Sequence, residues 1–152
     1  MGFILQLLDE TQSDKDIDTA MSCLIFSNTF YTFDVDKTKK IFLQQGIMMH
    51  PIWKEIDFWE KAILESISRE IREQNETIKM VDETEDERHL RIQTIIFAKL
   101  STMQDDMISC HVPPPEVKKV VLRFCNTHAL PQYQVDELTV KLRLFIYCVE
   151  PN

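Results

Sequence analysis

The cysteines and histidines are the residues of this chain best suited to chemistry, because thiolates and imidazoles bind zinc and act as nucleophiles or bases. Four of these eight residues form two close groups, Cys110 with His111 and Cys125 with His128. Adjacent residues are poorly placed to bind one ion tetrahedrally, and the chain holds no CxxC pair. We therefore expect no metal and no other cofactor, with the cysteines as buried thiols in a reducing compartment.

Catalytic motifs are also missing from the sequence. None of the four histidines lies beside a Ser or Cys in a nucleophile elbow. Only two glycines are present, and no glycine-rich loop could hold a phosphate. These observations favour a protein that is not an enzyme.

One stretch, from Asp34 to Thr38, begins like a calcium-binding loop. In that alignment Lys39 stands where the loop needs glycine, and Gln45 stands where it needs a bidentate glutamate. We therefore interpret this stretch as a polar turn.

Composition favours an all-α fold. The 152 residues are 44% hydrophobic, which is enough for a single compact core. The scarcity of glycine disfavours a fold with many β-turns. A net charge of −8 argues against a nucleic-acid or anionic membrane surface. The apolar run that follows Met1 is too short to be a signal peptide or a membrane span.

The longest predicted helix opens at Pro51, a residue type suited to the first helical position. His50 is expected to cap or border it. Its buried face is marked by residues spaced three or four apart: Ile52, Ile56, Trp59, Ile63, Ile67 and Ile71. This spacing predicts a long central amphipathic helix in which Trp59 is a core residue.

The other segments bring the predicted bundle to about six or seven helices in one domain, residues 1–152. The predicted helices are Phe3 to Asp9, Ser13 to about Tyr31, Thr38 to Gln45 with Gly46 as the C-cap, a helix carrying Ile92 to Met107, a helix carrying Val117 to Phe124, and a last helix opened by Pro131 that carries Val135 to Val149. The uncapped apolar start leads us to expect a fragment or short isoform of a longer protein, or a stand-alone copy of a module that usually occurs in larger proteins.

A run of acidic residues, Asp82 to Glu87, separates the long helix from the next one. Like charges repel and are costly to bury. We interpret the run as a mobile, protease-accessible linker, with an acidic helix start and a docking site for a basic partner as the alternatives.

Part of the chain resembles a module of Rab-regulating proteins. The residues that carry the resemblance are Lys40 to Leu43, His50 to Trp53 and Asp57 to Ile63, with Ala20 to Phe26, Thr29 to Tyr31 and Ile96 to Leu100 fitting more loosely. The module is similar to the C-terminal region of the MAP kinase-activating death domain protein, a DENN-type Rab exchange factor. It also resembles a small brain-enriched cytoplasmic protein and, more distantly, the set-binding-factor region of myotubularin-related proteins. The resemblance implies no catalytic residue.

Together these features lead us to expect a non-enzymatic, cytoplasmic protein–protein interaction module. Its partners would be small GTPase or signalling components of Rab or MAP kinase pathways and membrane traffic, and it would reach membranes only through them. The alternatives are part of a guanine-nucleotide exchange factor and a helical spacer in a longer chain. If a partner docks, we expect Phe42, Trp53 or Phe58 to contact a helix or peptide in an apolar groove.

Overall fold

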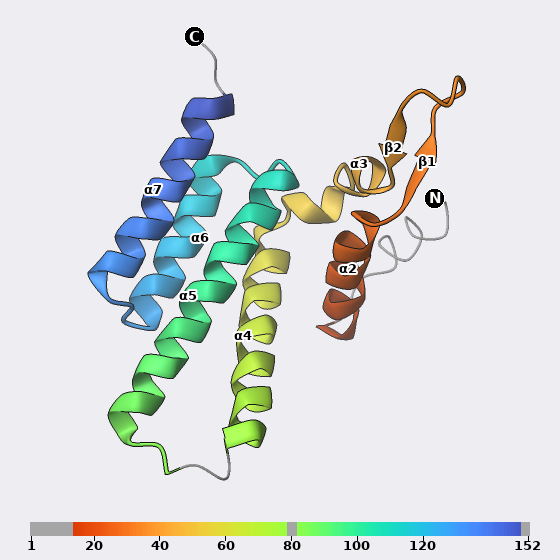
Figure 1. Ribbon diagram of the computed structural model, residues 1–152. Coiled ribbons are helices and arrows are strands. Elements are labelled where there is room, and N and C mark those ends of the chain that lie inside the picture. The colour runs from red at the N-terminus through yellow and green to blue at the C-terminus, as the bar shows by residue number, and fades with distance from the viewer. Residues whose placement is uncertain (1–13, 79–81, 150–152) are drawn as a thin grey trace. The chain divides into compact units, whose positions relative to one another are not determined.

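The structure is a computed structural model that describes residues 14–78 and 82–149, with side-chain burial for residues 17–78 and 82–144. It is all-α apart from one small hairpin, and 75% of it is helical. The α-helices are α2 (Asp14–Ser27), α3 (Gln44–Ile47), α4 (Ile56–Ile78), α5 (Glu85–Ser109), α6 (Pro114–Thr127) and α7 (Gln132–Val149) (Figure 1). The predicted helix from Phe3 to Asp9 lies outside the described residues.

The chain divides into two compact units. The hairpin unit comprises the described residues 14–62 and 109–111, and the bundle unit comprises 63–78, 82–108 and 112–149. The expected single domain over residues 1–152 stays a prediction. No helix among the described residues is both long and apolar enough to cross a membrane.

A β-hairpin replaces the helix predicted from Thr38 to Gln45, and that prediction was wrong. Strands β1 (Tyr31–Phe33) and β2 (Lys40–Phe42) pair antiparallel. Aromatic and β-branched side chains favour extended backbone, and each strand supplies the other's hydrogen bonds. Gly46 therefore lies inside the short helix α3 instead of capping a longer one.

Helix α2 ends at Ser27, four residues before the predicted end at Tyr31. The Ser27 hydroxyl donates to the Leu24 carbonyl at 2.6 Å, and the Thr29 hydroxyl donates to the Phe26 carbonyl at 2.7 Å. Such local side-chain bonds occupy the last helical carbonyls and help the chain leave the helix.

The predicted long helix is present, but it does not start at Pro51. Residues Pro51–Lys54 form a separate 3-10 turn, and Glu55 is extended before α4 begins at Ile56. His50 caps this turn, as expected, because its Nδ1 accepts from the Ile52 backbone N–H at 3.3 Å.

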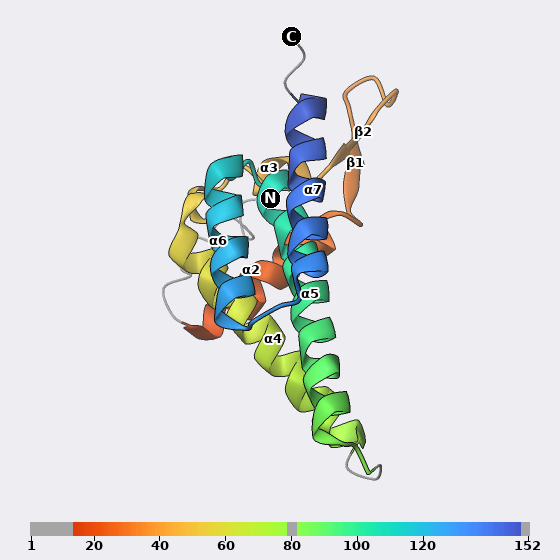
Figure 2. The same cartoon turned by 90° about the vertical axis from the view of Figure 1, so that its left-hand side faces the viewer.

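The bundle unit contains α5, α6, α7 and the part of α4 that follows Ala62. Helices α6 and α7 lie side by side in both views of the ribbon (Figures 1 and 2). The apolar periodicity predicted most of the core, which includes Ile63, Ile67, Ile96, Leu100, Met107, Val117, Val120, Phe124, Leu138 and Leu142. Apolar residues at helical spacing thus identified the faces that pack together.

Glu85 to Glu87 of the acidic run form the first turn of α5, whereas residues 82–84 precede the helix. The acidic helix start, one of the alternatives, is therefore present, and protease access to the run stays a prediction. The Glu87 carboxylate accepts from both the backbone N–H and the hydroxyl of Thr84, at 2.9 Å and 2.7 Å. The Thr84 hydroxyl in turn accepts from the Glu87 N–H at 3.3 Å. This reciprocal capping box satisfies early helical donors, and carboxylates at a helix N-terminus are favoured by its dipole.

Candidate docking surface

Many large apolar side chains of the hairpin unit are exposed to solvent. They are Ile25, Phe26, Phe30, Tyr31, Phe33, Val35, Ile41, Phe42 and Met49. Single exposed apolar residues are common on proteins, but a group gathered on neighbouring elements is typical of an interaction surface. This concentration makes the hairpin and the helix before it the candidate functional site.

The strand register places three aromatic rings on one face of the hairpin. Tyr31 pairs with Phe42 and Phe33 pairs with Lys40, and residues two apart on a strand share a face. We call Tyr31, Phe33, Lys40 and Phe42 the aromatic face. The Tyr31 ring centroid lies 5.6 Å from that of Phe33 and 5.7 Å from that of Phe42.

The aromatic face combines apolar area with a positive charge. The Lys40 Nζ lies 4.1 Å from the Tyr31 ring centroid, within the range of a cation–π interaction. Tyr31, Phe33 and Phe42 are 46%, 51% and 38% exposed. A partner could therefore cover these rings and place a carboxylate beside Lys40.

Asp34 closes the loop that joins the two strands. Its carboxylate accepts from the backbone N–H of Thr38 at 2.7 Å and of Lys39 at 3.1 Å, and from the Thr38 hydroxyl at 2.8 Å. The Lys39 N–H, followed by the Thr38 hydroxyl, lowers the pKa of Asp34. The calcium-like stretch is thus a turn, as predicted, and its first carboxylate is occupied by the turn's own donors.

The opposite side of the hairpin borders a groove on α2. The Leu43 N–H donates to the Phe30 carbonyl at 2.9 Å, so this pair extends the ladder by one step and lies on the opposite face from Tyr31 and Phe42. We call the groove of about 600 Å³ lined by Thr19, Ser22, Cys23, Phe26, Phe30 and Leu43 the α2 groove. The hairpin therefore contributes to two separate surfaces.

An aromatic core supports this region from within. Rings of Trp53 and Phe58 meet edge to face at 5.3 Å, and Trp53 lies 5.8 Å from Trp59. The Trp53 indole N–H donates to the Ile47 carbonyl at 2.7 Å, and the Trp59 indole N–H donates to the Trp53 carbonyl at 2.7 Å. These bonds connect α4 to α3, the helix that directly follows β2.

Burial separates the three residues expected to contact a partner. Trp53 is 0% exposed and Phe58 is 6% exposed, so both are core residues and neither offers a surface in this structure. Phe42 is exposed and belongs to the aromatic face. Sequence reasoning missed Tyr31 and Phe33, because only the strand register places them beside Phe42.

The zinc candidates are placed as ordinary packing residues. Cys110 and Cys125 are buried free thiols, and burial raises the pKa of Cys125. His128 stacks on Phe124 with ring centroids 6.1 Å apart. Within residues 14–78 and 82–149, no three His, Cys, Asp or Glu side chains are grouped so that they could hold a metal ion.

A second groove lies in the bundle unit between α4 and α5, and its charged rim is internally paired. It measures about 540 Å³ and includes Leu90 and Thr94. The Lys99 ammonium lies 2.9 Å from the Glu70 carboxylate. Charged groups that are already paired with each other are less available to a partner, so this groove offers fewer binding charges than its residue types suggest.

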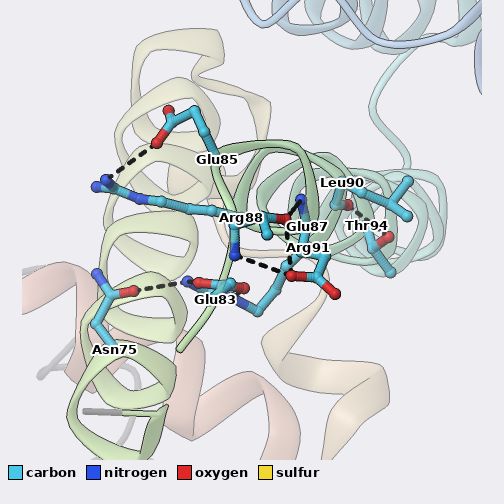
Figure 3. Close-up of polar contacts among 9 residues, drawn as sticks. Asn75, Glu83, Glu85, Glu87, Arg88, Leu90, Arg91 and Thr94 are labelled. Atoms are coloured by element: carbon cyan, nitrogen blue, oxygen red, sulfur yellow. Dashed lines mark hydrogen bonds and ion pairs between the residues drawn. The ribbon is translucent and has the colours of Figure 1, made fainter. Parts of the chain in front are cut away.

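Arg91 of α5 forms hydrogen bonds with α4 and with the connection between α4 and α5, which we call the α4–α5 tip (Figure 3). Its guanidinium donates to both Glu83 oxygens, at 2.7 Å and 2.9 Å, and to the Asn75 side-chain oxygen at 3.0 Å. The Arg91 hydrogen bonds hold the pKa of Glu83 below its usual range. Arg88 lies farther from its partner, 3.9 Å from Glu85.

One carboxyl group on α5 has an unusual pKa that the sequence did not suggest. Desolvation by burial, and then the nearby charge of Asp105, raise the pKa of Asp106 to about 6. Asp106 lines neither of the two grooves described above. A raised pKa does not by itself indicate catalysis.

No protein-family model, no curated protein and no solved structure matches this chain. The resemblance of the Pro-Ile-Trp and Phe-Trp segments to the Rab-regulating module therefore stays a prediction. The geometry of the hairpin unit is the remaining basis for a functional proposal.

Proposed function

We propose that the chain is a non-enzymatic protein–protein interaction module that docks its partner on the aromatic face. The observation that carries the proposal is the exposure of three clustered rings beside Lys40. Aromatic anchors supply much of the binding energy of protein interfaces. Rings that remain exposed to water add little hydrophobic stabilisation to the unbound protein, because their apolar surface is not buried.

The chemistry of the face defines the partner that it would suit. An apolar peptide or helix would cover Tyr31, Phe33 and Phe42, and an acidic group on it would approach Lys40. The cation would contribute mainly to orientation and association rate, and the rings to affinity. A role in Rab or MAP kinase signalling and membrane traffic, in the cytoplasm, is the part of the proposal that rests on the sequence resemblance.

Partner capture from cytosol tests the proposal. The protein would carry Tyr31→Thr and Phe42→Thr together, substitutions that keep β propensity and remove two rings of the face. We expect the double variant to lose partners that the parent protein recovers. Leu90→Thr is the matched control, because Leu90 is 57% exposed but lies on α5 in the bundle unit.

Folding must be checked before these results are compared. Circular dichroism should show the same helicity and the same thermal midpoint for all three proteins. Recovery of every partner by a folded double variant would remove the aromatic face from consideration. Nucleotide release from a panel of purified Rab proteins tests the exchange-factor alternative, and we expect the rates to be unchanged by this chain.

A further inference from the structure

Helix α7 carries large apolar side chains on the face that it turns to solvent. Tyr133, Val140 and Leu144 are 63%, 50% and 61% exposed. At about 100° of rotation per helical residue, their spacing places all three within an arc of about 40°. We call these three residues the α7 stripe. The buried residues Leu138 and Leu142 lie on the opposite face of α7 and belong to the core.

The neighbouring helix α6 lacks such a stripe. Among its residues 114–127, all of which the structure describes, no large apolar side chain is exposed. Its exposed positions are Pro115, Lys118, Lys119, Arg123, Asn126 and Thr127. A helix with one apolar face packs on one side, whereas a helix with two apolar faces is typical of packing on both sides. The α7 stripe is therefore suited to a second packing partner.

Charged residues border the α7 stripe in an order that makes this face complementary to itself. Two acidic residues, Asp136 and Glu137, come before two basic residues, Lys141 and Arg143, along α7. These four charges cancel over residues 132–144, although the whole chain has a net charge of −8. A second copy would therefore meet less repulsion at this face than the net charge of the chain suggests.

An antiparallel pair of α7 helices brings opposite charges together. A twofold axis near Val140 places each flank of one helix beside the same flank of its copy. Asp136 and Arg143 share a flank, so Asp136 of each copy meets Arg143 of the other. The same register sets Tyr133 opposite Leu144 of the second copy, and these pairs agree to about 2 Å along the axis at 1.5 Å of rise per residue. A parallel pair would instead place like charges side by side, which is unfavourable.

The contacts within the chain leave this flank able to pair. The Asp136 carboxylate accepts from the Gln132 amide at 2.9 Å, and a neutral donor does not cancel its charge. Arg143 is exposed. On the other flank, the Lys141 ammonium already lies 2.6 Å from the Asp105 carboxylate. The flank with Asp136 and Arg143 would therefore determine the direction and register of the pair.

We propose that the chain associates with a second copy of itself through an antiparallel, twofold-symmetric pairing of α7. Burial of the α7 stripe stabilises the pair, and the contacts between Asp136 and Arg143 orient it. A face one helix wide is smaller than the roughly 800 Å² that each partner contributes to a standard stable interface. The dimer is therefore reversible and forms as the protein concentration rises. The aromatic face belongs to the hairpin unit and forms no part of this pairing.

Sedimentation velocity of the full chain over a series of concentrations tests the pairing. The parent should show a monomer–dimer equilibrium. Val140→Ser combined with Leu144→Ser should weaken dimerisation several-fold, because the pair loses most of its apolar burial. Leu90→Ser is the matched control, because Leu90 is 57% exposed on α5, and it should leave the equilibrium unchanged. Circular dichroism should first show equal helicity in all of these proteins.

An exchange of charges tests the register separately from the apolar contact. Asp136→Arg alone and Arg143→Asp alone should each weaken dimerisation, because like charges then face each other. The protein with both substitutions should dimerise like the parent, because opposite charges face each other again. A mixture of the two single variants should form mixed dimers for the same reason. Damage to the fold would instead accumulate in the double variant.

Four results would overturn the proposal. The first is a parent protein that stays monomeric at every concentration. The second is dimerisation that the folded Val140→Ser and Leu144→Ser protein retains in full. The third is a double charge variant that dimerises no better than the single variants. The fourth is dimerisation that the Tyr31→Thr and Phe42→Thr protein loses, which would identify the aromatic face as the surface between copies.

Discussion

The β1–β2 hairpin and the α4–α5 tip both reverse the chain direction at the surface, but they differ in their side chains. The polar side chains of the tip have hydrogen-bond partners, whereas the apolar rings of the hairpin remain exposed. At the α4–α5 tip, Arg91 is bound by Glu83 and Asn75, and Thr84 and Glu87 bind each other. On the hairpin, the Tyr31 ring contacts those of Phe33 and Phe42, and all three rings remain about half exposed. Polar groups that already have partners stabilise the fold, whereas apolar groups left in water favour binding.

The largest expected effect concerns the scaffold that supports the hairpin. Trp59→Ala should cost about 3–5 kcal/mol in unfolding free energy, because it removes a fully buried indole and leaves a cavity. The exposed residues Lys54 and Glu55 should change it by no more than about 0.5 kcal/mol when replaced by Ala. Chemical denaturation measures all three, and equal midpoints for Trp59→Ala and the parent would contradict this packing.

A stabilising substitution is expected inside the bundle unit. Gln104 is 0% exposed, and neither its Nε2 nor its Oε1 has a hydrogen-bond partner. Gln104→Met keeps similar volume and removes the unpaired amide, so we expect a gain of about 1–2 kcal/mol. Gln132→Met, at an exposed position, is the control for a general effect of methionine. A loss of stability in Gln104→Met would show that the amide is satisfied in solution.

A smaller effect is expected at the α4–α5 tip. Arg91→Met should lower the thermal midpoint more than Arg88→Met, because the Arg91 and Glu83 side chains are only 16% and 18% exposed. The Glu83 pKa is lower in the folded state, so its contribution is present above the unfolded pKa of about 4.3 and is lost as pH falls through the folded pKa. The difference between parent and Arg91→Met should therefore shrink on acidification. A difference that persists at low pH would assign the effect to packing of the arginine stem.

The smallest effect should come from the aromatic face. Phe33→Thr should change the unfolding free energy by no more than about 0.5 kcal/mol, because the ring is 51% exposed and threonine suits a strand. Thermal unfolding of the parent and the variant measures the difference. A large loss would mean that the aromatic face serves folding and would weaken the contrast with the tip.

The sequence predicted the helices of the bundle unit because a helix face is a local pattern. Residues such as Leu100, Met107 and Val120 recur at helical spacing and are buried. The Thr84 to Glu87 capping box was also readable, since Thr followed three residues later by Glu is its known signature. This signature favours a helix start over a linker for the end of the acidic run.

The hairpin was harder to predict because its strands stabilise each other across a loop. Lys40 to Phe42 precede a glycine and fit the end of a short helix when read alone. Only pairing with Tyr31 to Phe33 makes them a strand and places Phe42 beside Tyr31. The sequence therefore pointed to only one residue of the candidate site, Phe42. Its neighbours Tyr31 and Phe33 could be identified only from the strand register.

The most direct test of the aromatic face as the docking surface is site-specific photo-crosslinking in cells. Benzoyl-phenylalanine would replace Phe42 in one protein and Leu90 in another, both after a check of folding. We expect position 42 to form an adduct with a second polypeptide of different sequence and position 90 to form none. Adducts at position 90 alone, or none at position 42, would contradict it.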